Sequence, residues 1–167
     1  SVPAYELEYG EEHSHRQPHQ LADIAAFYNA FGLQVNKEVG ERVDHVTVEC
    51  EFMSFLLYKE AYAIEHDGEE KAAVCREAAR HFLSDHLASW VPSFARRLSK
   101  SVEAGLMKTI AEFAFLFIVE DAQSEELSVG SLDMPIRAIA DGVETGCVSC
   151  LSKSGLQTNM AGGCGDA

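Results

Sequence analysis

The stretch from Val43 to Ile64 constrains the fold of this chain more than any other. Its apolar residues recur at spacings of three and four, which is the period of one face of an α-helix. They form two stripes, and a helix that is apolar on two sides needs neighbours on both. We therefore expect a central helix that is packed on both stripes. The first stripe contains Val46, Cys50, Met53, Leu57, Ala61 and Ile64, and the second contains Phe52, Leu56 and Ala63.

The polar positions of the same stretch carry more charge than a buried structural helix usually does. Asp44 precedes the first turn, where a carboxylate can accept hydrogen bonds from free backbone N–H groups, so we expect it to be the N-cap. His45 and Glu49 lie one turn apart, at the spacing of an oriented acid–base pair. The charged and polar residues concerned are Asp44, His45, Glu49, Glu51 and Glu60.

The helical part of the sequence lacks the common catalytic motifs. It contains no glycine-rich phosphate loop, no nucleophile elbow and no His-Glu-x-x-His zinc pair. Cys50 follows Glu49 directly, but its position in the first stripe predicts a core-facing thiol, which is unreactive. We therefore expect a protein that is not an enzyme.

Four further helices are predicted around the central one, and no segment alternates between apolar and polar residues as a half-buried strand does. Pro92 lacks a backbone donor, so we expect a bend at Trp90 to Pro92 and a new helix after it. The sequence predicts an all-α, single-domain helical bundle over residues 1–121 and a partly disordered, cysteine-containing tail over residues 122–167. The four helices cover Gln20 to Gly32, Glu69 to Ser84, Phe94 to Ala104 and Leu106 to Glu120.

The balance of charge limits the classes of partner. The chain has 27 acidic and 13 basic residues, for a net charge of −14. Such a field opposes the phosphates of nucleic acids and favours basic peptides. The longest unbroken apolar run, from Phe113 to Val119, is too short to span a bilayer. The odd number of cysteines, five, does not resemble a disulfide framework, so a reducing cytoplasm is the expected location.

Two groups of residues have the chemistry of metal ligands. His13, His15 and His19 lie in a polar loop, where imidazoles can converge on one ion but are more often only solvated. The tail contains a C-x2-C pair and a third cysteine, which suit zinc or an iron–sulfur cluster but lack a fourth ligand. A metal- or Fe–S-binding maturation factor is therefore an alternative, although we expect no resident cofactor. The cysteines are Cys147, Cys150 and Cys164.

Two motifs in the correct order carry a resemblance to a known family. The first runs Asp44-His45-Val46-x-x-Glu49-x-Glu51-Phe52-Met53-x-x-Leu56, and the second runs Phe82-Leu83-x-x-His86-Leu87-x-x-Trp90-Val91-Pro92-x-Phe94. Together they resemble the TorD/DmsD/NarJ superfamily of chaperones for molybdenum oxidoreductases, over about residues 3 to 120. The stretch Pro3-x-Tyr5-Glu6 adds similarity to the branch that serves type II dimethyl-sulfoxide-reductase-like enzymes, such as those for dimethylsulfide, ethylbenzene, selenate, chlorate and perchlorate.

The resemblance implies an all-helical, non-enzymatic, system-specific cytoplasmic chaperone of anaerobic respiration. Such a protein binds the immature catalytic subunit, in many members through its twin-arginine signal peptide. It keeps that subunit competent for insertion of the molybdenum cofactor before export or assembly. An acidic body with an apolar groove would complement a signal that is first basic and then apolar.

Carried onto matching positions, the resemblance implies a client-binding site with a polar side and a neighbouring bend. Val43 replaces the family's usual proline before Asp-His. The helices that normally precede the Pro3-x-Tyr5-Glu6 stretch are absent, so we expect a truncated chain whose exposed face promotes self-association as a homodimer. The polar side would be Asp44, His45, Glu49 and Glu51, and the bend would be His86, Trp90 and Pro92.

Overall fold

The structure is a computed structural model that describes residues 1–11, 17–36 and 40–137. Within these ranges all regular structure is helical, apart from two isolated bridge pairs, so the all-α prediction is confirmed. The α-helices are α1 (Gln17–Ala30), α2 (Val46–His66), α3 (Glu69–Phe82), α4 (Ala88–Ser101) and α5 (Leu106–Ser124). A 3-10 turn, η1 (Glu6–Glu8), precedes them, and a π-helical turn, η3 (Leu83–Leu87), joins α3 to α4.

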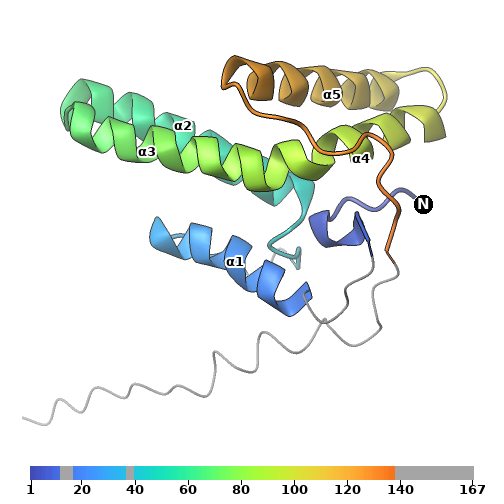
Figure 1. Cartoon of the computed structure of the whole chain (residues 1–167), viewed down its shortest axis with the longest axis horizontal. Coiled ribbons are helices and arrows are strands. Elements are labelled where there is room, and N and C mark those ends of the chain that lie inside the picture. Colours follow the sequence, from blue (N-terminus) through green and yellow to red (C-terminus); the bar gives the residue numbers. More distant parts are fainter. Residues whose placement is uncertain (12–16, 37–39, 138–167) are drawn as a thin grey trace, which may run out of the picture.

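The long helices form two neighbouring hairpins (Figure 1). α2 and α3 run side by side, α4 continues the direction of α3, and α5 folds back along α4. α1 lies against the opposite side of the α2–α3 pair. The turn between α2 and α3 is tight because Gly68 adopts a φ of 93°, which a side chain would disfavour, and donates its N–H to the Ala63 carbonyl.

An aromatic cluster forms the contact between α1, α2 and the end of α3. The Phe52 ring lies 4.6 Å from the Tyr28 ring and 4.8 Å from the Phe82 ring, measured between centroids. Tyr28 of α1 and Phe82 of α3 therefore pack against Phe52, which belongs to the second predicted stripe of α2. The first stripe is packed only in part, which corrects the expectation of two buried sides: Cys50, Leu57, Ala61 and Ile64 are exposed.

The expected bend at Trp90 to Pro92 and the helix start at Phe94 are wrong, because α4 begins at Ala88 and runs through Pro92. Pro92 has no N–H, so it leaves the Ala88 carbonyl without its helical partner. The Gly130 N–H donates to that carbonyl at 2.9 Å and replaces the missing bond. The helical irregularity lies one turn earlier, in the π-helical turn η3.

The folded body extends beyond residue 121, where the sequence placed its end. α5 continues to Ser124, and the chain after it returns along α4 to the N-terminal segment (Figure 1). Met134 N–H donates to Ser93 Oγ at 3.1 Å, and Arg137 N–H donates to the Glu8 carbonyl at 2.8 Å. These contacts are made by backbone groups of a polar segment, which apolar periodicity cannot reveal. The cysteines of the predicted tail lie outside the described residues.

Gly130 offers a test of this return segment. A Cβ atom at Gly130 would overlap the Ser89 carbonyl oxygen, so Gly130→Ala must push the segment away from α4. We expect the free energy of unfolding to fall by about 1–3 kcal/mol, through overpacking and loss of the bond to Ala88. Urea unfolding followed by circular dichroism measures it. Ser128→Ala, at an exposed site of the same segment, is the control, and an equal effect of both changes would contradict the proline-compensating contact.

Candidate functional site

Three segments far apart in sequence meet at the start of α2. The N-terminal segment pairs with the residues before α2 through two backbone bonds, from Glu6 N–H to the Asp44 carbonyl and from Val46 N–H to the Ala4 carbonyl, each at 2.9 Å. The turn η3 and the first residues of α4 form the third segment. The sequence-predicted site residues, except Glu51 and Pro92, all contribute to this junction or to its edge.

Asp44 is completely buried and is not the N-cap of α2, which corrects the sequence expectation. Its carboxylate accepts from Arg42 Nε at 2.9 Å and Nη2 at 2.6 Å, and from Leu7 N–H at 3.1 Å. Arg42 also lies 3.6 Å from the Glu8 carboxylate. A buried charge is tolerated when its partners are this close, so Asp44 ties the N-terminal segment to the entry of α2.

His45 takes the capping role instead. Its Nδ1 accepts from Thr47 N–H at 3.2 Å and lies 2.7 Å from Thr47 Oγ1. Because Nδ1 is an acceptor from the backbone, the ring proton of the neutral form lies on Nε2, which is 3.9 Å from the Glu41 carboxylate. The ring also makes an edge contact with Tyr5, with centroids 4.9 Å apart. His45 is half-buried, and these contacts hold its ring in one orientation.

Glu49 is the second buried carboxyl group, with none of its surface exposed. Its Oε2 accepts from the Trp90 indole N–H at 3.0 Å, whereas its Oε1 has no hydrogen-bond partner. Burial raises the pKa of the Glu49 carboxyl well above its usual value, and the negative charge of Glu6 raises it further, against the lowering effect of the Trp90 bond. The arrangement favours a neutral Glu49 in the core.

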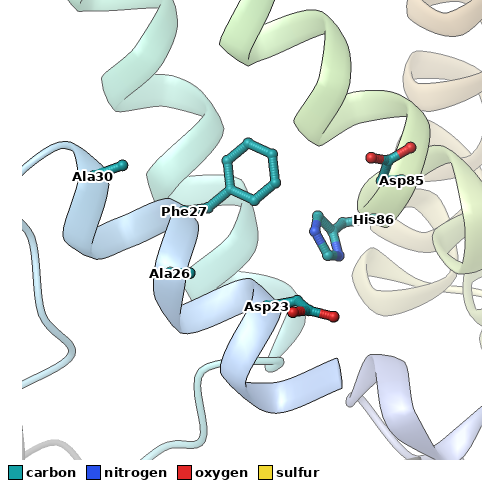
Figure 2. Close-up of a pocket in the computed structure, with 6 residues that line it drawn as sticks. All are labelled: Asp23, Ala26, Phe27, Ala30, Asp85 and His86. Carbon is teal, nitrogen blue, oxygen red and sulfur yellow. The ribbon is translucent and has the colours of Figure 1, made fainter. Parts of the chain in front are cut away.

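His86 connects this junction to the surface. Its Nδ1 lies 3.0 Å from Glu6 Oε2, and its ring packs against Phe82 and Phe27, with centroids 4.8 and 5.6 Å apart. The ring lines an open hollow of about 540 Å³ between α1 and η3. Figure 2 shows the rings of Phe27 and His86 and the carboxylate of Asp23 around this space. The lining residues are Asp23, Ala26, Phe27, Ala30, Asp85 and His86.

The predicted client-binding residues thus divide by exposure. Asp44, Glu49, Trp90 and Pro92 are buried, and they touch other parts of the fold. His86 is 7% exposed and lines the hollow, and His45 is partly exposed. Glu51, on α2, is the one residue of this set that is classed as exposed.

Sequence reasoning missed several members of the junction. Glu6 was quoted within a motif but was given no role, and Arg42 and Phe27 were not considered. The only available signal was the placement of Arg42 two residues before Asp44, because the other contacts join segments that are dozens of residues apart.

α5 contributes a surface that sequence reasoning did not single out as a site. Six of its large apolar side chains are exposed, whereas Phe115 packs against the core. The buried residues of α5 are Ala111, Ala122 and Ile118. We call the outward set the α5 stripe. It consists of Leu106, Met107, Ile110, Phe113, Leu116 and Phe117, which are between 47% and 78% exposed.

The described residues offer no evident place for a metal or a membrane span. No three His, Cys, Asp or Glu side chains in this part of the chain are grouped as metal ligands would be. His19 is exposed, while His13, His15, Cys147, Cys150 and Cys164 lie outside the described residues. None of the helices described is both long and apolar enough to cross a bilayer.

The raised pKa of Glu49 leads to a prediction about pH. The folded chain keeps the Glu49 proton at pH values where the unfolded chain, with a pKa near 4.5, has lost it, so the free energy of unfolding falls as pH rises through this range. Glu49→Gln cannot ionise and can still accept from Trp90. We expect it to match the wild type near pH 5 and to be more stable by about 1–3 kcal/mol at the alkaline end.

Chemical denaturation between pH 5 and pH 9 measures this difference. Glu51→Gln is the matched control, because it removes the same charge from an exposed position of the same helix. If both variants change the pH dependence equally, net charge rather than burial explains it, and the buried neutral carboxyl is contradicted.

Comparisons with known proteins agree with the motifs. The family model described as nitrate reductase delta subunit matches residues 1–96, more than half of the chain. The selenate reductase assembly chaperone protein of Thauera selenatis is 39% identical over 84 residues, and the chlorate reductase assembly chaperone protein of Ideonella dechloratans is 38% identical over 78 residues. The chaperone protein TorD of Vibrio cholerae is 33% identical over 92 residues.

These alignments cover 50%, 47% and 55% of this chain, respectively. They cover 42%, 39% and 40% of the relatives, so the chain spans about two fifths of the length of the curated relatives it matches. Residues 1–96, which the family model matches, include the junction of η1, α2 and η3. The chain therefore belongs to the nitrate reductase delta subunit family, the TorD/NarJ group of chaperones that its two motifs resemble.

Proposed function

We propose that this protein is a system-specific cytoplasmic chaperone, not an enzyme, that binds the immature catalytic subunit of a molybdenum oxidoreductase. The names of its relatives support an assembly role, since they are chaperones for selenate and chlorate reductases and TorD. They do not favour the alternative of a metal- or Fe–S-carrying factor. The single observation that carries the proposal in this structure is the α5 stripe.

The α5 stripe has the size and chemistry of a polypeptide-binding surface. Its six apolar residues are between 47% and 78% exposed, so the stripe is on the order of the 300–600 Å² that the largest apolar patch of a typical monomer covers. Leu106, Ile110, Phe113 and Phe117 are spaced by four, three and four residues, which suits a second helix lying alongside.

The charge of the chain indicates the kind of occupant. A net charge of −14 attracts a segment that is basic beside its apolar part, and it opposes a second copy of the same acidic chain. We therefore assign the α5 stripe to an apolar segment of the client, which includes its twin-arginine signal peptide where it has one. The finer identity of the client, a type II dimethyl-sulfoxide-reductase-family catalytic subunit, rests on the sequence resemblance.

The residues predicted as the client site have different roles in this proposal. Asp44, Glu49 and Trp90 act as positioning residues, because they hold the N-terminal segment against α2 and α4 without reaching the surface. His45 and Glu51 have exposed surface, so we assign direct contact with the client to them. No cofactor of the chaperone itself is part of the proposal.

Removing aromatic surface from the α5 stripe tests the proposal. We expect Phe113→Ser with Phe117→Ser to weaken binding of a cofactor-free type II catalytic subunit by about tenfold or more, which corresponds to roughly 1.4 kcal/mol. The fold should be preserved, because both side chains are more than half exposed. Titration calorimetry with the purified subunit and with its signal peptide measures both affinities.

Val74→Ser is the matched control, since Val74 is 62% exposed on α3, away from the α5 stripe. Light scattering at the same concentrations shows whether the stripe instead holds a homodimer. A dimer that the double substitution dissolves, or client binding that it leaves intact, would overturn the assignment of α5 to the client. Client binding that depends on residues 145–167 instead would favour the metal-factor alternative.

A further inference from the structure

The return segment, residues 127–137, is an outer layer on the helical body. It runs from the end of α5 along α4 to the N-terminal segment (Figure 1). None of its residues is buried, whereas Ala88 and Ser93 on the α4 side of the contact are. A segment with so few buried apolar side chains opens at a lower free energy than the helices beneath it. Its side chains that pack against the core, all of them partly exposed, are Leu127, Val129 and Met134.

α4 holds the return segment through main-chain atoms. The Ala88 carbonyl accepts from Gly130 N–H at 2.9 Å, and Ser93 Oγ accepts from Met134 N–H at 3.1 Å. Arg97 Nη2 donates to the Met134 carbonyl at 2.8 Å. We call this row of three partners on α4, Ala88, Ser93 and Arg97, the α4 track. Because every residue has the main-chain groups that it engages, the α4 track suits an extended polypeptide of many sequences.

Glu126, directly before the return segment, has a strained backbone. Its φ is 57°, the one positive value at a residue other than glycine in the described part of the chain. It follows the last turn of α5, where glycine is the usual residue because a Cβ atom disfavours the left-handed conformation. Strain of this kind persists only where other contacts impose it. Opening of the return segment would relieve it, so Glu126 has the properties of a hinge.

Arg97 shows that the closed segment leaves a donor of the α4 track unused. Its Nη2 donates to the Met134 carbonyl, but its Nε is buried and has no hydrogen-bond partner. A carboxylate can accept from Nε and Nη2 together, which a single carbonyl oxygen does less well. The neighbouring Arg96 already pairs with Asp133 at 3.1 Å. This end of the α4 track therefore favours an acidic segment, the opposite charge to that of a twin-arginine signal peptide.

We propose that the return segment is an intramolecular competitor, hinged at Glu126, which occupies the α4 track until an extended, acidic segment of the client displaces it. Displacement exchanges one set of main-chain hydrogen bonds for another, so its net cost is small. The client's carboxylate adds a bond to Arg97 Nε, and release of the hinge removes the strain. The inference rests on the proposed chaperone function for the source of the displacing segment.

Native-state hydrogen exchange of the full chain measures the opening. We expect the amides of Gly130 and Met134 to exchange together, about tenfold or more faster than the slowest amides of α4, because the segment opens without global unfolding. Exchange of both amides at the rate of the slowest α4 amides would overturn the proposal, since the segment would then be released only when the whole fold unfolds.

Substitution of Glu126 tests the strain. Glycine adopts the left-handed conformation without a steric cost, so Glu126→Gly should slow the exchange of Gly130 and Met134 by about threefold or more. Glu126→Gln is the matched control, because it removes the same charge but keeps the Cβ atom, and it should leave the exchange rates unchanged. Equal slowing by both variants would assign the effect to charge and contradict a strained hinge.

The same segment, supplied as a separate peptide, tests the competition. The peptide has the sequence of residues 127–136, which contains no arginine, and NMR follows Ser93 and Arg97 of the full chain. Gly130→Ala pushes the chain's own segment off α4, so this variant should bind the peptide about fivefold or more tightly than the wild type. Ser128→Ala is the matched control and should bind like the wild type. Equal affinities of Gly130→Ala and the wild type would overturn the competition.

Two further changes keep this test decisive. A peptide with alanine in place of Gly130 would overlap the Ser89 carbonyl and should not bind. If it binds as well as the original peptide, the peptide does not occupy the α4 track, and the proposal is contradicted. If Gly130→Ala fails to fold, Glu126→Val opens the same segment at its hinge, because a β-branched residue rarely adopts a positive φ, and it should gain the same affinity.

Binding of the client separates this inference from the chaperone proposal. Gly130→Ala should bind the cofactor-free catalytic subunit about threefold or more tightly than the wild type, and added Arg97→Lys should abolish the gain, because an ammonium group cannot pair bidentately. If Gly130→Ala leaves client binding unchanged while Phe113→Ser with Phe117→Ser weakens it, the competition is overturned and the α5 stripe stands. If Gly130→Ala tightens client binding while the double serine variant leaves it intact, the competition stands and the assignment of the α5 stripe fails.

Discussion

The hydrogen bond from the Trp90 indole to the Glu49 carboxyl group is the interaction on which the rest of the structure depends. It joins α2 to α4 in the core and satisfies one oxygen of a completely buried acid. The other oxygen has no partner, and Glu6 lies near enough to raise the pKa of Glu49 further. Loss of the Trp90 bond would leave both groups unpaired in the core at a large cost, so this bond fixes α4 against α2. Glu6 also contacts His86, so the position of the N-terminal segment affects the orientation of a ring that lines the surface hollow.

In the sequence, the same motifs are expected both to hold the fold together and to contact a client. In the structure, different residues serve these two purposes. The acids and the tryptophan of the motifs determine where the N-terminal segment, α2 and α4 lie, and most of them have no exposed surface. The surfaces available to another molecule are elsewhere, at the α5 stripe and at the hollow beside His86. In this account the motif residues affect a client through the shape they maintain. This explains why a buried acid such as Asp44, paired with the partly buried Arg42, can occur in a binding protein.

Much of the fold could be predicted, because the period of the apolar residues in α2 and α5 is a local property. Details that depend on distant partners could not. Asp44 has the right residue type for an N-cap, but Arg42 and the Leu7 N–H engage its carboxylate, so His45 caps instead. Pro92 would normally break a helix, yet Gly130, 38 positions away, supplies the missing donor to Ala88.

The candidate site was less predictable than the fold, because it too depends on contacts between residues that are far apart in the sequence. α5 is apolar on more than one face, and the sequence alone does not show that the six residues of the α5 stripe are exposed while Ala111, Ile118 and Ala122 are buried. The hollow was missed because Asp23, Phe27 and Asp85 come from two helical segments without a shared motif. Five of the seven residues predicted as the client site are also buried, which residue type does not reveal: Asp44, Glu49, His86, Trp90 and Pro92.

The central claim is that the client binds to the α5 stripe and does not touch the buried residues of the junction, Asp44, Glu49 and Trp90. Site-specific photocrosslinking tests it most directly, with a photoreactive phenylalanine at position 113 on α5 and, for comparison, at exposed Glu70 on α3. The account predicts that the cofactor-free catalytic subunit is captured from position 113 and that position 70 yields no adduct. Capture from position 70 with none from position 113 would contradict it.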